Sequence, residues 1–281
     1  MSKDQKNSSH NKQSQTPYIA IGLSFFEDIN PLEKCLDSVL GNPDLRPYVK
    51  VLAVDGKYKG YPIDHDLSED GSRELIMDYA RRYPGLVQLY DYPNDHERFK
   101  RQKYVNLAAE QEIPWLFILD SDEWIQVPKV ERFIKELKRI EEEWYETNIE
   151  NALPTQRVGN VVTVMCVELG QDSGLPVQTK GVPRLWYRPQ DMHYTTKHYW
   201  FARKEDIPDP NKTENFRQDN LSLILGAKYK SLSVSNIVIW HSHQDRDDDR
   251  EKRRKYYEYE RLPKLEGSPK LGIFDKENIK Q

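Results

Sequence analysis

The sequence predicts an α/β domain with a mostly parallel β-sheet flanked by helices. Short apolar runs, each the length of one strand, alternate along the first half of the chain with segments whose apolar residues recur at helical spacing. This alternation favours right-handed crossovers between parallel strands. Two of the runs lead directly into aspartates, Asp55 and Asp120, and ligands of open parallel sheets bind where strands end. We therefore expect a ligand site at the carboxyl edge of the sheet.

Four strands are expected in the first half, each an apolar run of the kind that is buried on both faces of a sheet. They cover residues 18–24, 49–55, 86–90 and 115–119. The first expected helix begins at Asn30 and Pro31, because Asn is a good N-cap and Pro suits the first helical position, and it ends at Gly41. Two further helices are expected, one from near Ser68 or Ser72 to Pro84 and one over residues 103–111.

The pattern changes beyond Pro128. The elements expected there are a charged helix over 129–150, a β-rich stretch over 158–169, aromatic-rich strands or loops over 184–188 and 194–201, a strand over 233–241 and a charged helix over 245–262. The chain thus divides into a disordered N-terminal arm (1–17), two halves of one domain (18–127 and 128–262) and a tail (263–281).

Composition narrows the class of protein. The net charge of −4 is the small difference between 46 acidic and 42 basic residues, so the chain as a whole does not attract nucleic acid or an anionic membrane. Cys35 and Cys166 stand far apart in apolar surroundings, which favours a reducing compartment. No stretch approaches the ~20 apolar residues of a membrane-spanning helix, and the first residues lack the apolar core of a signal peptide. We expect a cytoplasmic protein, with peripheral attachment to a membrane left open.

The sequence Asp120-Ser121-Asp122 follows the fourth apolar run directly. A strand that delivers two carboxylates into a loop builds a site of hard oxygen ligands, which suits Mn²⁺ or Mg²⁺ with phosphate oxygens as further ligands. Such a cation neutralises a diphosphate leaving group. The alternative is a solvated acidic loop, because two aspartates at this spacing often occur by chance. The apolar strand before the motif and Asp55 upstream favour the metal site.

Four segments resemble family 2-type glycosyltransferases of the GT-A fold, in that family's order and at about its spacings. They are residues 19–27, 36–40, 51–55 and 115–123. The resemblance implies a Rossmann-like nucleotide-diphospho-sugar transferase, in which residues 18–127 bind the nucleotide sugar and residues 128–262 form the acceptor side. It implies a UDP- or GDP-linked donor and Mn²⁺ or Mg²⁺ as cofactor.

The resemblance also implies which residues contact the nucleobase. These are the loop after the first strand, where Phe25 and Glu27 stand, and Asp55 at the end of the second strand. In this chain Asp55 is followed by Gly-Lys-Tyr in place of the family's acidic or serine-rich turn. The identity of the nucleotide is therefore left open.

Further implied residues contact the phosphates and the metal. Arg101 is the best match for a basic residue that contacts base or phosphate, and Lys103 is the second. A solvated basic face is the alternative for this stretch, although Arg and Lys are the side chains that pair with phosphate. Asp120 would reach the ribose or the metal through a water, and Asp122 would bind the metal directly.

The acceptor side is less defined. Arg184 lies in a segment similar to one that lies beside the acceptor site in some members, but His198 is followed by Tyr199 where those members carry an acidic residue. An inverting transferase needs a carboxylate base, whereas a retaining one does not need it in the same position. Asp191 is the favoured base, with Glu205 and Asp219 as the other candidates. Trp200 either packs in the core or stacks on a sugar.

The acceptor itself is left open as a sugar, a protein or a lipid-linked molecule. The basic and aromatic residues 250–261 read as a solvated helix with internal ion pairs, or as a surface that contacts lipid.

His241 and His243 alternate on the last expected strand, so both point to one face. A histidine late in the chain completes the metal shell in several GT-A enzymes, and imidazole is a reasonable Mn²⁺ ligand. The alternative for each is a structural histidine in a strand.

Three other functions share parts of this pattern. A phosphatase of the haloacid-dehalogenase type also places two aspartates after a strand, but near the start of its domain. A sugar nucleotidyltransferase carries a Gly-rich, Arg-containing loop after the first strand, where this chain has Phe25-Phe26-Glu27. The third is a GT-A-like protein that binds nucleotide or carbohydrate without catalysis.

Overall fold

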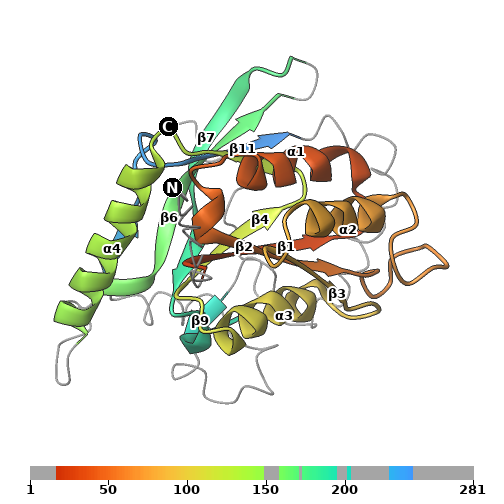
Figure 1. The fold of residues 1–281 in the computed structure, drawn as a ribbon, viewed down its shortest axis with the longest axis horizontal. Helices are drawn as coiled ribbons and strands as arrows, with labels where there is room; N and C mark the ends of the chain where they lie inside the picture. Colours follow the sequence, from red (N-terminus) through yellow and green to blue (C-terminus); the bar gives the residue numbers. More distant parts are fainter. Residues whose placement is uncertain (1–16, 149–157, 171–172, 195–200, 204–227, 243–281) are drawn as a thin grey trace, which may run out of the picture.

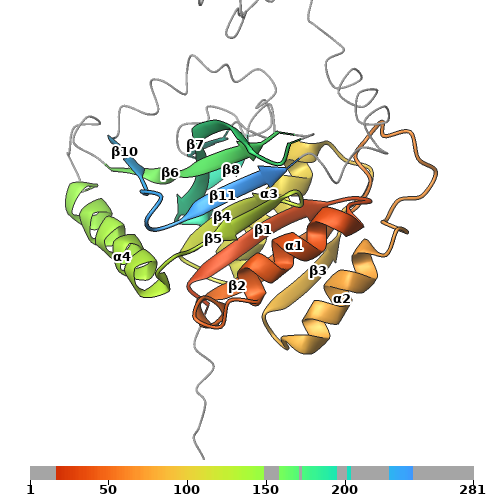
Figure 2. The same ribbon diagram turned by 90° about the horizontal axis from the view of Figure 1, so that it is seen from above.

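The computed structural model describes residues 17–148, 158–170, 173–194, 201–203 and 228–242. Within these residues a nine-stranded sheet has the order β3-β2-β1-β4-β7-β6-β11-β5. Strand β10 pairs with β6 outside that path (Figure 1 and Figure 2). Its strands are β1 (Ile19–Phe25), β2 (Val49–Asp55), β3 (Val87–Asp91), β4 (Trp115–Asp120), β5 (Glu123–Gln126), β6 (Val158–Leu169), β7 (Pro176–Tyr187), β10 (Lys228–Ser231) and β11 (Val238–Ser242). Two short strands, β8 (Met192–Tyr194) and β9 (Phe201–Arg203), form a separate antiparallel pair.

The predicted fold class, α/β with a mostly parallel sheet flanked by helices, is confirmed. Parallel pairing joins β3, β2, β1 and β4, and also joins β6 to β10 and β11. Antiparallel pairing in the described part of this sheet joins β4 to β7, β7 to β6, and β11 to β5. Because β7 is antiparallel to both β4 and β6, the strands β4, β6 and β11 run in the same direction. Their carboxyl ends therefore lie at one edge of the sheet.

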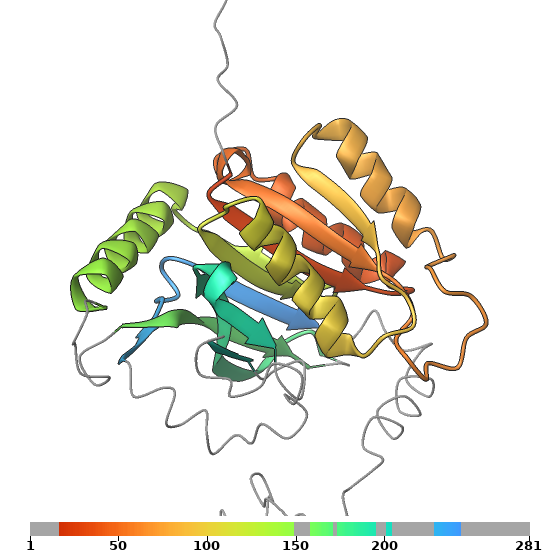
Figure 3. The same cartoon turned by 90° about the horizontal axis from the view of Figure 1, so that it is seen from below.

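Helices cover both faces of the sheet. They are α1 (Ile29–Leu40), α2 (Ser72–Arg82), α3 (Glu97–Glu110) and α4 (Val130–Thr147). Apolar residues of α1, α2 and α4 join the larger buried cluster on one face, and Figure 2 shows α1 and α2 on that side. Apolar residues of α3 join the second cluster on the other face, which Figure 3 shows with α3 lying across the sheet.

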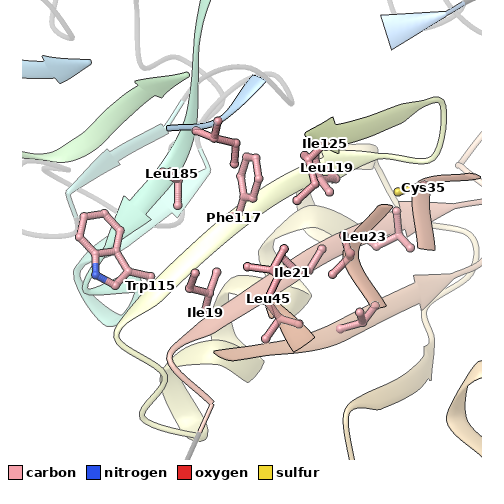
Figure 4. Packing of buried hydrophobic residues seen from close by; sticks show 14 of the residues in the cluster. Ile19, Ile21, Leu23, Cys35, Leu45, Trp115, Phe117, Leu119, Ile125 and Leu185 are labelled. Atoms are coloured by element: carbon pink, nitrogen blue, oxygen red, sulfur yellow. The ribbon is translucent and has the colours of Figure 1, made fainter. Parts of the chain in front are cut away.

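The central strands are apolar on both faces, as the sequence predicts. In β1 the side chains of Ile19, Ile21 and Leu23 face the larger cluster, whereas Ala20 faces α3 (Figure 4). The same alternation holds in β4, where Phe117 packs beside these residues. A strand buried on both faces has no polar side to reveal its period, which is why the sequence shows a continuous apolar run.

Gly22 of β1 lies close against Tyr104 of α3. A Cβ at this position would lie 2.5 Å from a ring carbon of Tyr104, which is fully buried and hydrogen-bonded to Tyr194. Because the ring cannot move away easily, we expect Gly22→Ala to lower the free energy of unfolding by about 1–3 kcal/mol. Urea unfolding of Gly22→Ala beside Gly181→Ala measures this. The nearest side-chain atom to a Cβ at Gly181 is 3.7 Å away, so the control should lose little, and equal losses would contradict the packing argument.

The structure differs from the expectation in four elements, α3, β5, β7 and β10. Helix α3 begins at Glu97, six residues before the expected start at Lys103, because the charged residues of its first turns are buried and the apolar pattern does not show them. Strands β5 and β10 are not predicted, and β7 begins at Pro176, well before residue 184. The helix expected over residues 245–262 lies outside the described residues. No helix in the described segments is long and apolar enough to cross a bilayer.

Candidate functional site

Strand register gathers the predicted acidic residues at the carboxyl edge of the sheet. Ser24 of β1 lies opposite Asp120 of β4, and Phe25 lies opposite Asp55 of β2. On the far side, β11 places His241 opposite Glu123, and the amide of Ser242 donates to the carbonyl of Asp122 at 3.3 Å. The edge predicted from strand ends alone therefore also receives the last strand of the described chain.

Asp120 lies between two arginines, the buried Arg101 and the half-buried Arg184. Arg101 of α3 donates to Asp120 Oδ1 at 2.5 Å, and Arg184 of β7 donates to Asp120 Oδ2 at 2.8 Å. Arg184 reaches this point because the pairing of β7 with β4 ends at Leu185 opposite Phe117. Burial favours the neutral carboxyl, but the two guanidinium groups prevail and hold the pKa of Asp120 well below its usual range. Asp120 is thus a permanent anion with both oxygens engaged.

Glu123 completes this ion-pair network and was not among the predicted site residues. Its side chain is buried, accepts a hydrogen bond from Arg184 at 2.5 Å and accepts another from the backbone amide of Asp120 at 3.0 Å. Burial, followed by the charges of Asp120 and Asp122, raises the pKa of Glu123 despite the opposing Arg184. The only signal in the sequence is that Glu123 follows the acidic motif directly.

Asp122 and His241, each expected from the sequence to bind a metal ion, lie in direct contact. Nε2 of His241 lies 3.0 Å from Oδ2 of Asp122, and Nδ1 lies 3.9 Å from Oε1 of Glu168 on β6. Burial of the imidazole acts to lower its pKa, but the hydrogen bond to Asp122 and the nearby carboxylates outweigh it, so the pKa of His241 is raised. Both residues come from strand ends that meet only in the folded sheet.

The fit of these residues to a divalent cation can be judged from their spacing. Two ligand atoms that each lie about 2.1 Å from one metal ion, at right angles to each other, are ~3.0 Å apart. Oδ2 of Asp122 and Nε2 of His241 have this separation, 3.0 Å. Among the residues that the structure describes, no group of three or more His, Cys, Asp and Glu side chains is arranged to hold a metal ion. The geometry therefore offers a two-residue ligand pair, to which phosphate and water oxygens could be added. His243 lies outside the described residues.

Asp55 is fully buried and is held by this chain's own residues. Ser68 donates to it through its hydroxyl at 2.7 Å and its amide at 3.1 Å, and Arg73 of α2 donates at 2.7 Å while also pairing with Asp91 of β3. The residues directly after Asp55 do not form the acidic or serine-rich turn of the family that the chain resembles. In the structure a serine-rich and acidic segment that begins at Ser68 contacts Asp55 instead.

Glu27 and Phe25 mark the end of β1 in different ways. Glu27 has a left-handed backbone, with φ of 54°, and its carboxylate accepts from the amide of Glu69 at 2.6 Å and lies 2.9 Å from Nε2 of His65. The side chain of Phe25 is fully buried in the larger core cluster. Phe25 can therefore offer only main-chain atoms to a ligand, whereas Glu27 ties the end of β1 to His65 and Glu69.

The two basic candidates on α3 point in different directions. Arg101 faces Asp120, whereas the ammonium of Lys103 lies 5.8 Å from the ring centre of Tyr90 on β3. Lys100, one residue before Arg101, is fully buried, and its ammonium donates to carbonyls at the ends of β1 and β2. The structure brings Arg101 to the acidic motif and does not bring Lys103 there.

Asp191 lies away from the other candidates. It pairs with Arg188, 2.6 Å away, and the amide of Arg188 donates to Pro114, just before β4 begins. Asp120 is at the other end of this strand, about 17 Å further along at ~3.3 Å per residue. The structure thus does not bring Asp191 to the acidic motif. His198, Trp200, Glu205 and Asp219 lie outside the described residues.

Comparison with known proteins adds a similarity of fold. No protein-family model matches the chain, and no curated protein matches its sequence. Solved structures of Staphylococcus aureus TarS are similar: TarS 1–349 in complex with UDP has a TM-score of 0.48 at 12% identity, and TarS 1–349 has 0.46 at 11%. Each match covers 80% of this chain and 60% of TarS 1–349. A longer TarS structure has a TM-score of 0.45 at 14% identity, covering 85% of this chain and 39% of that one.

Proposed function

We propose that this chain is a metal-dependent glycosyltransferase of the GT-A type that transfers a sugar from a UDP- or GDP-linked donor. One arrangement carries the proposal. At the carboxyl edge of the sheet, the Asp122–His241 pair lies beside two arginines that converge on Asp120. Carboxylate and imidazole suit Mn²⁺ or Mg²⁺, and guanidinium groups suit the oxygens of a diphosphate. The family 2-like sequence pattern of the first half agrees with this assignment.

Each residue of this site would have a distinct role in binding the donor. Asp122 and His241 would hold the cation, which supplies charge neutralisation for the departing diphosphate. Arg101 and Arg184 would bind diphosphate oxygens, and Asp120 would keep the two guanidinium groups aligned while facing the ribose. Glu27 and Asp55 would shape the nucleobase pocket through the loop that they hold. The assignment moves Arg184 from the acceptor side to the donor side, because its partners are Asp120 and Glu123.

Binding of nucleoside diphosphates tests this function directly. We expect UDP or GDP to bind at least about tenfold more tightly with Mn²⁺ or Mg²⁺ than with a chelator, because Asp120, Asp122 and Glu123 repel a diphosphate that has no bridging cation. Titration calorimetry in the two conditions measures the difference. Equal affinity would remove the metal from the proposal, and absence of binding to either nucleotide would remove the donor class.

Turnover then separates an enzyme from a protein that only binds nucleotide. Release of UDP or GDP from a panel of nucleotide sugars, measured with metal present, is expected for the donor that the site accepts. Metal-dependent binding without turnover of any donor would favour the non-catalytic alternative.

A further inference from the structure

Lys100 is a fully buried lysine in the first turns of α3. Its ammonium donates hydrogen bonds to two main-chain carbonyls, those of Phe25 and Gly56, the second at 2.7 Å. It also lies 4.3 Å from the ring centre of Tyr58. Burial of an ammonium costs several kcal/mol unless hydrogen bonds and opposite charges compensate it. An apolar side chain would leave both carbonyls without these hydrogen bonds, so Lys100 joins two segments of main chain as well as filling space.

The two carbonyls mark the points at which the chain leaves β1 and β2. Phe25 is the last residue of β1, and Gly56 follows the last residue of β2. Both exits turn sharply, since Glu27 has φ of 54° and Gly56 has φ of 145°. A Cβ at Gly56 would lie 2.6 Å from the carbonyl carbon of Tyr92, so the exit of β2 is also closely packed. Lys100 thus links the two exits that carry Glu27 and Asp55, the residues proposed to shape the nucleobase pocket.

Charged groups from several elements face this ammonium. Burial lowers the pKa of Lys100 to about 7, against the opposing effects of Asp55 on β2, Asp28 before α1 and Glu97 on α3, while Arg101 adds to the lowering. Tyr58 faces it from the loop after β2. When Lys100 loses its proton, both hydrogen bonds become weaker because their donor is no longer charged. The negative charges of the three carboxylates then lack the nearby positive charge of the ammonium. A diphosphate would then approach a more negative pocket.

We propose that Lys100 is a positioning residue for nucleotide binding, in which the charged ammonium fixes the exits of β1 and β2 at the spacing that admits a nucleobase. Its proton thereby couples nucleotide affinity to pH. The inference rests on the proposed function, because it takes the base to lie between these two exits. Within the described residues the ammonium of Lys100 is held by two main-chain carbonyls and the ring of Tyr58, so we expect it to act by positioning the main chain and not on the reacting atoms.

UDP affinity measured in Mg²⁺ from about pH 6 to pH 9 tests the coupling, with Lys100→Gln as the reference. The glutamine keeps two N–H donors but does not titrate, whereas the ionisation of UDP is the same with either protein. We expect the affinity of the wild type, divided by that of Lys100→Gln, to fall about five- to tenfold as the pH rises through the pKa of Lys100. Lys100→Met should bind about tenfold more weakly than the wild type at low pH and show no such fall. A constant ratio between wild type and Lys100→Gln would overturn the proposal.

Hydrogen exchange in the ligand-free protein gives a readout that does not need the nucleotide. The amides of Lys57, Lys59 and Ser68 are hydrogen-bonded within the folded loop, to Asp66, Asp95 and Asp55 respectively. After correction for intrinsic exchange, their protection should fall with rising pH in the wild type and stay constant in Lys100→Gln. Lys138→Gln, an exposed lysine on α4, should behave as the wild type.

The two measurements separate failure of this inference from failure of the proposed function. If UDP and GDP do not bind but the protection of the loop follows the proton of Lys100, the donor assignment is wrong and the positioning role of Lys100 in the fold stands. If nucleotide binds with metal but neither affinity nor protection differs from Lys100→Gln in its pH dependence, the role of Lys100 is wrong and the donor assignment stands.

Discussion

Asp122→Asn is expected to lower sugar transfer by at least about 1,000-fold while leaving the protein folded. The carboxylate is the anionic member of the proposed ligand pair, and a metal ion that neutralises a leaving group contributes several kcal/mol to catalysis. The amide has nearly the same volume and can still hydrogen-bond to His241, which lies 3.0 Å from Oδ2 in the wild type. Turnover of the donor and the affinity for UDP with and without Mn²⁺ should both be measured.

The matched control for this substitution is Asp78→Asn, which removes the same charge from α2, where Asp78 pairs with Arg82 on the surface. It should retain turnover and the metal dependence of nucleotide binding. His241→Gln should weaken Mn²⁺ in the nucleotide complex without the full loss seen for Asp122→Asn. Full activity in a folded Asp122→Asn protein would exclude Asp122 as a metal ligand, whatever His241 does.

The edge of the sheet at which the site lies could be predicted because buried parallel strands are recognisable in the sequence as continuous apolar runs. Runs such as the one before Asp120 are apolar throughout, so their ends are visible in the sequence, and the shared direction of parallel strands brings those ends together. The same reasoning places His241 at this edge once the last strand is taken as parallel to β4. The sequence does not predict which side chains are hydrogen-bonded to each other at this edge, because such partners lie up to 119 residues apart in the chain.

The residues that sequence reasoning missed are charged and buried. Lys100 and Glu123 are fully or almost fully buried, yet a periodicity argument treats any charged residue as solvated, and α3 therefore appeared to start later than it does. Arg184 was predicted to lie on the acceptor side because its segment resembles one found there. In the structure the pairing of β4 with β7 ends at Leu185, and the next residue, Arg184, donates to Asp120. These positions depend on ion pairs between distant elements, which no local pattern encodes.

Arg184→Met is expected to lower the free energy of unfolding by about 3–5 kcal/mol at neutral pH, because it leaves buried carboxylates without a counter-charge. The side chain of Glu123 is 3% exposed and that of Arg184 is 12% exposed, so solvent screens their ion pair little. Asp120 retains Arg101, whereas Glu123 loses the one cation whose salt bridge to it is described here. Urea unfolding of Arg184→Met, Glu123→Gln and the double variant measures the coupling as a thermodynamic cycle.

The pH dependence of this loss has a definite sign. The pKa of Glu123 is already raised in the folded protein by burial and by Asp120 and Asp122, and removal of Arg184 should raise it further. A raised carboxyl pKa means that the folded state favours the proton, so the deficit of Arg184→Met should be full above the folded-state pKa and shrink as the pH falls through it towards the ordinary value near 4.5. The double variant with Glu123→Gln should recover part of the stability at neutral pH, since the neutral amide needs no counter-charge. If its loss equals the sum of the two single losses at every pH, Arg184 and Glu123 do not interact.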